Sequence, residues 1–127
     1  MQVDIVTPES VLFSEKNISM VTVPGIEGQM GILDDHLPVV TFLKPGVINV
    51  EKNENKYFFT TGGVVDFKNN SLSILCQEIF DVKDLTDEKI SELKNRANKK
   101  LEDKDSTDHD TFISRVMLDE LNLLQSK

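Results

Sequence analysis

The sequence predicts an α+β protein, with an antiparallel β-sandwich or barrel over residues 1–84 and a two-helix hairpin over residues 85–127. Three observations support this fold class. All six glycines and all four prolines lie at or before residue 63, and these residues mark turns and strand ends. Short runs rich in β-branched and aromatic residues fill the first part, as is typical of sheets with many short strands. From residue 85 onward neither glycine nor proline occurs, which permits helices.

Six short segments carry the strand signals. Alternating polarity, or β-branched and aromatic content, predicts strands at residues 2–6, 17–23, 47–50, 56–60, 64–67 and 72–75. The pair Asn69-Asn70 predicts a turn between the last two of these strands. The intervals between the segments leave no room for crossover helices, so parallel βαβ units are not expected.

Two glycine-containing segments resemble functional loops. The segment from Gly25 to Gly31 lacks the Gly-Lys-Ser/Thr ending of a phosphate-binding loop, and a strand rather than a helix follows it. It therefore predicts a tight turn and a bulge in a sheet. The pair Gly62-Gly63 stands between strand-like runs and predicts a hairpin turn or a bulge.

Local signals define both helices of the second part. Thr86 is a candidate N-cap, and acidic residues follow it in the first turn, where negative charge suits the helix dipole. Thr107 and Asp110 have the spacing of a capping box before the second helix. Each helix carries a narrow apolar stripe, formed by Ile90, Leu93, Ala97 and Leu101 in the first and by Ile113, Val116, Met117, Leu121 and Leu124 in the second. Two such helices joined by a short polar loop predict a hairpin.

Composition excludes several classes of function. The net charge of −8 would repel nucleic acid and anionic lipid. No run approaches the roughly 20 apolar residues that span a bilayer, and the N-terminal segment lacks the apolar core of a signal peptide. The expectation is a cytosolic protein that reaches a membrane only through a partner. The single cysteine, Cys76, lies in an apolar run and is expected to be a buried small hydrophobe.

His36 is the one residue that suggests chemistry, because it follows Asp34 and Asp35 directly. Adjacent aspartates do not point the same way, and no second cluster of ligands stands nearby, so no metal is predicted. The chain has no Ser-His-Asp order and no Cys-x-x-Cys pair. A small enzyme that uses His36 with Asp34 or Asp35 is an alternative with little support from the residues.

Three sequence blocks resemble the epsilon subunits of bacterial F-type ATP synthases. The first block runs from Val23 to Val40 and carries Glu-Gly, then Gly-Ile, then His and Pro. The second, 43–48, reads Leu-Lys-Pro-Gly-Val-Ile, and the third is the Gly62-Gly63 pair with the valine and aspartate that follow it. The blocks occur in the family's order and spacing, and together they cover most of residues 1–84.

The resemblance implies a ten-stranded β-sandwich followed by a helical hairpin, in a non-catalytic rotor subunit of the central stalk. Its partners would be the gamma subunit and the c-ring, and the alpha and beta catalytic subunits would be reached through the tail. The residues that the resemblance assigns to gamma and c-ring binding are Glu27, Gln29, Met30 and His36. The resemblance also implies that the protein is a peripheral membrane protein at the cytoplasmic face of the plasma (inner) membrane. It implies no cofactor. A free-standing β-sandwich binding module with a helical partner-binding tail is the alternative.

The tail matches the family less closely. Relatives that bind ATP carry a stretch similar to Ile/Leu-Asp-x-x-Arg-Ala, where this chain has Thr86 for the acid, Lys89 for the arginine and Ile90 for the alanine. Arg96 matches a second arginine of that site. Lysine lacks the planar fork that grips phosphate through two bonds, so poor or absent ATP binding is expected. The segment from position 85 has eight basic and ten acidic residues, so the tail is nearly neutral. Whether the tail inhibits ATP hydrolysis is left open by the sequence.

Overall fold

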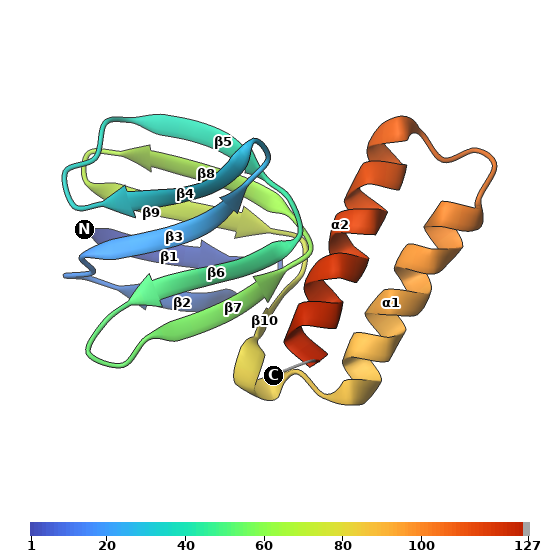
Figure 1. Ribbon diagram of the computed structural model, residues 1–127. Helices are drawn as coiled ribbons and strands as arrows, with labels where there is room; N and C mark the ends of the chain where they lie inside the picture. The colour runs from blue at the N-terminus through green and yellow to red at the C-terminus, as the bar shows by residue number, and fades with distance from the viewer. Residues whose placement is uncertain (126–127) are drawn as a thin grey trace. The chain divides into compact units, whose positions relative to one another are not determined.

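The computed structural model describes residues 1–125. The chain forms two compact units, Met1–Val82 and Lys83–Lys127, and each is described by itself. The first unit contains only strands and turns, and the second contains the helices (Figure 1). The sequence placed the boundary at residue 84, which is the last residue of a short 3₁₀ turn at Val82–Asp84.

The first unit has the ten strands that the resemblance implied. They are β1 (Gln2–Val6), β2 (Val11–Glu15), β3 (Met20–Gly25), β4 (Gly28–Leu33), β5 (Val39–Leu43), β6 (Gly46–Glu51), β7 (Lys56–Thr60), β8 (Gly63–Lys68), β9 (Ser71–Cys76) and β10 (Ile79–Asp81). The six segments predicted from local patterns all correspond to strands. The strands β2, β4, β5 and β10 had no predicted range of their own.

The strands form two layers that are joined at one point. One layer has the order β10-β7-β6-β3-β4, and the other has the order β5-β8-β9-β1-β2. The single paired position Gly25↔Leu43 links β3 to β5, and the Lys44 amide donates a 3.0 Å bond to the Pro24 carbonyl beside it. The pairing is antiparallel throughout except between β1 and β9, which run parallel. The predicted antiparallel sandwich is confirmed, with this one parallel pair where β1 lies between β9 and β2.

The core lies between the two layers. Inward side chains alternate with outward ones along each strand, as the two-residue period of a strand requires. The fully buried members include Val3, Ile5, Val21, Val23, Ile32, Ile48, Val65, Phe67, Leu72 and Ile74. Cys76 is also buried in this core, as predicted, and burial raises the pKa of its thiol.

The Gly62-Gly63 segment is not a hairpin turn, so that part of the prediction was wrong. The strands on its two sides, β7 and β8, pair with different neighbours, and the segment carries the chain from one layer to the other. Gly62 has a φ of 136°, and a Cβ on Gly63 would lie 2.3 Å from the Leu75 carbonyl oxygen. The buried Thr60 hydroxyl fixes this corner, because it accepts a 3.1 Å bond from the Gly62 amide. The Asn69-Asn70 turn is confirmed, since both residues have positive φ, as a two-residue hairpin turn requires.

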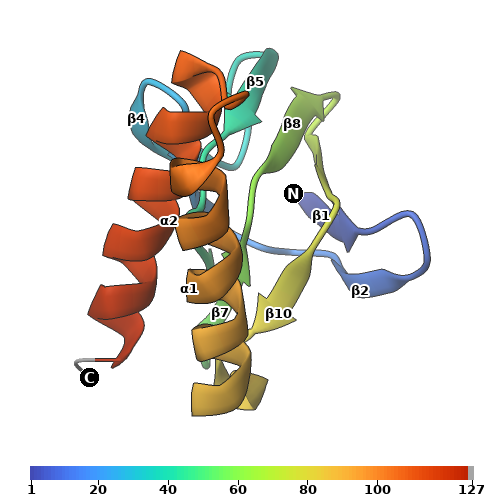
Figure 2. The ribbon, with the colours of Figure 1, turned by 90° about the vertical axis from the view of Figure 1, so that its right-hand side faces the viewer.

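The second unit contains the two predicted helices, α1 (Asp87–Glu102) and α2 (Asp108–Gln125), which pack side by side (Figures 1 and 2). Thr86 caps α1 by accepting a 3.1 Å bond from the Lys89 amide. The capping box before α2 is confirmed in both directions: Asp110 N donates to Thr107 Oγ1 at 3.0 Å, and Thr107 N donates to Asp110 Oδ2 at 3.1 Å. Neither described helix is long and apolar enough to cross a membrane.

Candidate partner-binding surface

The four residues that the sequence assigned to partner binding do not form one cluster. Glu27 lies in the β3–β4 turn, and Gln29 and Met30 lie at the start of β4. His36 lies in the loop that follows the other end of this six-residue strand. At about 3.4 Å per residue, the two groups stand roughly 20 Å apart. The structure thus separates the predicted set into two groups at opposite ends of β4, which are its two candidate contact points.

The turn that carries Glu27 is a two-residue connection closed by glycines. Gly25 pairs with Gly28 across it, and Gly28 adopts a φ of 144°, which other residues rarely reach. A Cβ on Gly25 would come within 2.7 Å of the Gly28 carbonyl oxygen. Glu27 and Gln29 are exposed, while Met30 is partly buried against the core. The local glycines therefore explain the tightness of this turn, which presents the Glu27 carboxylate to solvent.

The loop that carries His36 is held from several sides. Asp34 Oδ1 accepts bonds of 2.8 Å from the Met1 terminal ammonium and from Asn70 Nδ2. Asn70 Oδ1 accepts a 2.8 Å bond from the Asp35 amide. The His36 ring stacks edge-to-face on Phe67 with ring centroids 6.0 Å apart. The Met1 ammonium and Asn70 together hold the pKa of Asp34 below its usual value.

These contacts do not support a pairing of His36 with Asp34 in a small enzyme. The Asp34 carboxylate is engaged by Met1 and Asn70 and not by His36. His36 Nδ1 lies 2.6 Å from the Leu37 carbonyl oxygen. Among residues 1–125 no group of three or more His, Cys, Asp or Glu side chains is placed to hold a metal ion.

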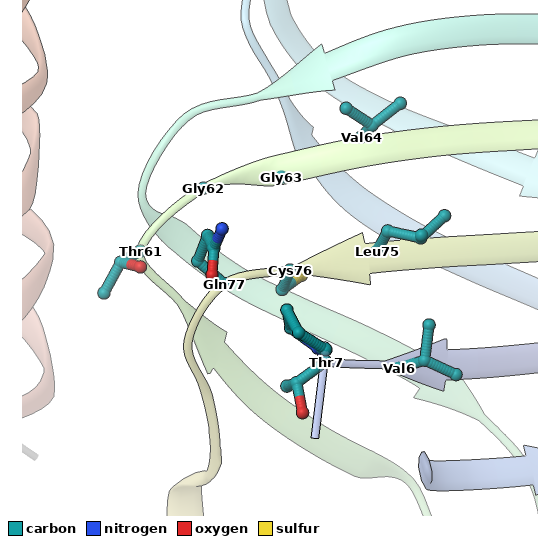
Figure 3. A pocket seen from close by; sticks show the side chains of 10 residues that line it. Val6, Thr7, Thr61, Gly62, Gly63, Val64, Leu75, Cys76 and Gln77 are labelled. Atoms are coloured by element: carbon teal, nitrogen blue, oxygen red, sulfur yellow. The ribbon is translucent and has the colours of Figure 1, made fainter. Parts of the chain in front are cut away.

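An apolar row across the outer face of the second layer is a candidate binding feature that the sequence analysis missed. The aligned pairs Phe42↔Val64, Val64↔Leu75, Leu75↔Val6 and Val6↔Val11 bring one side chain from each of five strands into line. We call these five residues the apolar row. Phe42 is 67% exposed, Val11 63% and Leu75 51%. Figure 3 shows its central members, Val64, Leu75 and Val6, on three neighbouring strands.

Two residues further along the strands, a polar row runs parallel to the apolar row. The aligned residues Asp66, Ser73, Asp4 and Ser14 form it. Asp4 Oδ1 accepts bonds from Ser14 Oγ at 2.5 Å and from Gln2 Nε2 at 3.0 Å. The outer face thus combines exposed apolar side chains with two carboxylates about 7 Å away along the strands.

The only sequence signal for the apolar row is a local break in alternation. In β8 and β9 the row member stands beside a core residue, as Val64 beside Val65 and Leu75 beside Ile74. A strand with one solvent-exposed face should carry a polar residue at every second position. Two adjacent apolar residues therefore mark a position where both faces are apolar, but only the strand pairing shows that such positions line up.

Arg96 lies exposed on α1, at a shallow depression of about 600 Å³. The other lining residues are Asp87, Glu88, Ser91, Glu92, Asn95 and Lys99. Three of these are acidic, so the charge around Arg96 is unfavourable for a phosphate group.

The comparisons with known proteins agree with this architecture. Residues 1–82 match the family model of the ATP synthase delta/epsilon chain β-sandwich domain. The chain is 39% identical over 124 residues to the ATP synthase epsilon chain of Pelagibacter ubique, covering 97% of this chain and 95% of that one. It is 37% identical over 107 residues to the epsilon chain of Desulforamulus reducens, covering 83% and 80%.

A solved structure shows the same fold. It is a chain from the Euglena gracilis mitochondrial ATP synthase, in a structure described as OSCP, F1 and c-ring, and it matches with a TM-score of 0.73 at 18% identity. The match covers 98% of this chain and 78% of that chain. Given the family match over the sandwich and the similarity to epsilon chains over nearly the whole length, the protein belongs to the ATP synthase delta/epsilon chain family.

Proposed function

We propose that this chain is a non-catalytic rotor subunit in the central stalk of a proton-translocating F-type ATP synthase. In this role it joins the gamma subunit to the c-ring and couples proton flow to ATP synthesis, while the catalytic sites lie on other subunits. The observation that carries the proposal is the similarity to epsilon chains over 97% of the chain. The contacts of His36, which are with the Phe67 ring and the Leu37 carbonyl oxygen, fit a structural loop rather than a catalytic group.

The apolar row is the proposed gamma-binding surface. Phe42, Leu75 and Val11 are each more than half exposed, and contiguous apolar patches on soluble proteins mark interaction sites. Burial of apolar surface gives about 25 cal/mol per Å² before the costs of association. A sheet face that is already folded suits a permanent joint, because no backbone order has to be gained on binding.

The two contact points at the ends of β4 suit a subunit that is held between two partners. Glu27, Gln29 and Met30 form one point and His36 the other. We assign these points to the c-ring and the gamma subunit together, without dividing them between the two. The complex would be attached to the cytoplasmic face of the plasma (inner) membrane, and the chain would be peripheral to it.

The helical tail is the proposed contact with the alpha and beta subunits, and a regulatory role for it stays a proposal. Three acidic neighbours of Arg96 support poor or absent ATP binding at α1. Calorimetry that gave micromolar affinity for ATP would contradict this. If the tail does not inhibit ATP hydrolysis, a complex with a chain that ends at Asp84 should hydrolyse ATP at the same rate as a complex with the full chain.

The test of the main proposal is binding to an ATP synthase catalytic complex from the same organism that lacks this subunit. Size-exclusion chromatography should show one copy of the chain retained per complex. Phe42→Ser should weaken binding at least tenfold, because it removes an exposed aromatic anchor from the apolar row. Tyr57→Ser is the matched control, since Tyr57 is 45% exposed but lies on the other layer.

Each outcome has a distinct meaning. If the folded chain fails to bind its cognate complex, the rotor proposal is wrong and the free-standing binding module becomes the better interpretation. If Phe42→Ser and Tyr57→Ser bind equally well, the rotor role stands, but the gamma-binding surface lies elsewhere.

A further inference from the structure

Two loops at one end of the sandwich are joined by the side chain of Asn70. One is the β4–β5 connection, residues 34–38, which we call the His36 loop, and the other is the β8–β9 turn. Figure 1 shows both at the end of the first unit where the N-terminus lies. Asn70 Oδ1 accepts a 2.8 Å bond from the Asp35 amide, and Asn70 Nδ2 donates a 2.8 Å bond to Asp34 Oδ1. One amide side chain thus binds both the backbone and a side chain of the His36 loop.

The backbone on both sides is shaped for this contact. Asn70 has a φ of 56° and Asp35 a φ of 64°, a left-handed conformation that asparagine and aspartate adopt more readily than other residues with a side chain. The Asn70 carbonyl oxygen also accepts a 3.2 Å bond from the Gln2 amide, which ties the turn to β1. Asn70 therefore reaches the His36 loop from a turn whose own position is fixed by the sheet.

The His36 loop presents an apolar side chain at its surface. Leu37 is 79% exposed, more than any other large apolar side chain among residues 1–125. His36 is partly buried with its ring against the buried Phe67, and its amide donates a 3.0 Å bond to the Leu33 carbonyl oxygen. A partner that covers Leu37 avoids the cost of ordering the loop only if the loop is already held in place.

We infer that Asn70 is a positioning residue, which holds the His36 loop in the conformation that the partner subunits bind, and this inference rests on the proposed function. Asn70 acts through the loop rather than through contact with a partner. Loss of its two bonds should weaken binding and slow association, because the loop would have to be ordered as it docks. Asp34 would keep its bond to the Met1 ammonium, so the Asp35 amide is the group that loses its acceptor.

A purely structural role for Asn70 predicts a different result. If Asn70 only stabilised the sandwich, its loss would speed amide exchange in the core of β8 and β9 as well as in the His36 loop. The association rate of the folded chain would then be unchanged. A positioning role confines the faster exchange to the His36 loop, because only this segment opens, and it lowers the association rate.

The experiment uses the full chain and the ATP synthase of the same organism, with its c-ring, from which this subunit has been removed. Asn70→Gly removes both bonds but keeps a residue that adopts positive φ freely. It should weaken binding by about fivefold or more, chiefly through a lower association rate in surface plasmon resonance. Amide exchange followed by NMR should be faster at Asp35.

Asn69→Gly is the matched control, because it makes the same change at the preceding position of the same turn, where φ is 52°. It should bind with native affinity, since the bonds to the His36 loop come from Asn70. A second test places two carboxylates together. Asn70→Asp should weaken binding, because it sets a like charge against Asp34. Asp34→Asn added to this variant restores a donor and an acceptor with their places exchanged, so it should recover most of the binding.

The outcomes separate the positioning role from the proposed function. Failure of the unmodified chain to bind would contradict the proposed function itself. Beside a binding-competent unmodified chain, equal affinities of Asn70→Gly and Asn69→Gly would overturn the positioning role alone. Two other results would also overturn it: faster exchange throughout the core of β8 and β9 in Asn70→Gly, or no recovery of binding in the double variant.

Discussion

The sandwich and the helical hairpin reach stability by different means. In the sandwich, side chains from all parts of residues 1–82 meet in one core, and many of them are completely buried. In the hairpin, each helix has only three buried residues, which are Ile90, Leu93 and Ala97 in α1 and Ser114, Met117 and Leu121 in α2. The stability of the hairpin depends more on the capping hydrogen bonds at the N-terminal ends of its helices. The comparison shows why one part suits a rigid joint and the other can open locally at low cost.

The largest expected effect tests the dependence of the sandwich on its corner. Gly63→Ala should lower its free energy of unfolding by at least about 2 kcal/mol, because the new Cβ would press on the Leu75 backbone. Tyr57 is the only tyrosine, and the chain has no tryptophan, so tyrosine fluorescence during denaturant unfolding reports on the sandwich.

Gly31→Ala is the matched control for this change. A Cβ on Gly31 would meet only the Met20 Cε atom, at the end of a flexible side chain, 2.7 Å away. Its cost should stay below about 1 kcal/mol. Equal costs for both variants would show that the corner is less constrained than the backbone contact indicates.

A smaller effect is expected at the capping box of the hairpin. Thr107→Ala removes the hydroxyl that accepts the bond from the Asp110 amide. The loss of such a cap costs about 1 kcal/mol. Hydrogen exchange followed by mass spectrometry should show faster exchange in the first turns of α2 and unchanged exchange in the sandwich.

Thr107→Ser tests whether the hydroxyl is responsible. Serine keeps the acceptor, so exchange in α2 should return close to the native rate. Faster exchange in the sandwich core as well would mean that the two units do not open separately.

The smallest expected effect is on the stability of the fold at low pH. The folded pKa of Asp34 is lowered by the Met1 ammonium and Asn70, so its contribution to stability is present above the unfolded pKa of about 3.8. The contribution is lost as the pH falls through the lower folded pKa. Asp34→Asn should therefore reduce stability at pH 7 and weaken the decline of stability as the pH falls below about 4, measured by tyrosine fluorescence.

Asp35→Asn is the control for the acid experiment. Asp35 has a φ of 64°, and asparagine tolerates this conformation as well as aspartate does. Its stability at pH 7 should stay close to that of the unmodified chain, because the bond of Asp35 to Asn70 is made by its backbone amide. If Asp34→Asn behaves in the same way as Asp35→Asn, the bonds of Asp34 do not contribute to folding.

The contrast between the units also explains what could be predicted from the sequence. Thr86 and the Thr107–Asp110 box act over three residues, so their roles follow from spacing alone. The Asn69-Asn70 turn is equally local. The prediction of a hairpin turn at Gly62-Gly63 was wrong. A hairpin turn and a crossing between layers have similar local sequences, and only the strand pairing of β7 and β8 distinguishes them.

The candidate site shows the same limit. The resemblance named Glu27, Gln29, Met30 and His36 as one set, but the length of β4 separates them. The apolar row was not predicted, because each of its strands contributes a single side chain. Its existence depends on the registers of four strand pairs, including the parallel pair β1–β9, and register is a property of the folded sheet.

The buried thiol of Cys76 has a practical consequence for experiments on this chain. It is the only cysteine, and burial both shields it and raises its pKa, so little of the reactive thiolate is exposed in the folded protein. A cysteine introduced on the surface could therefore carry a fluorescent dye alone, and its rotation in an assembled enzyme could be followed without removing Cys76. In a chain without such a cysteine, the rate at which Cys76 itself is labelled would measure how often the sandwich opens.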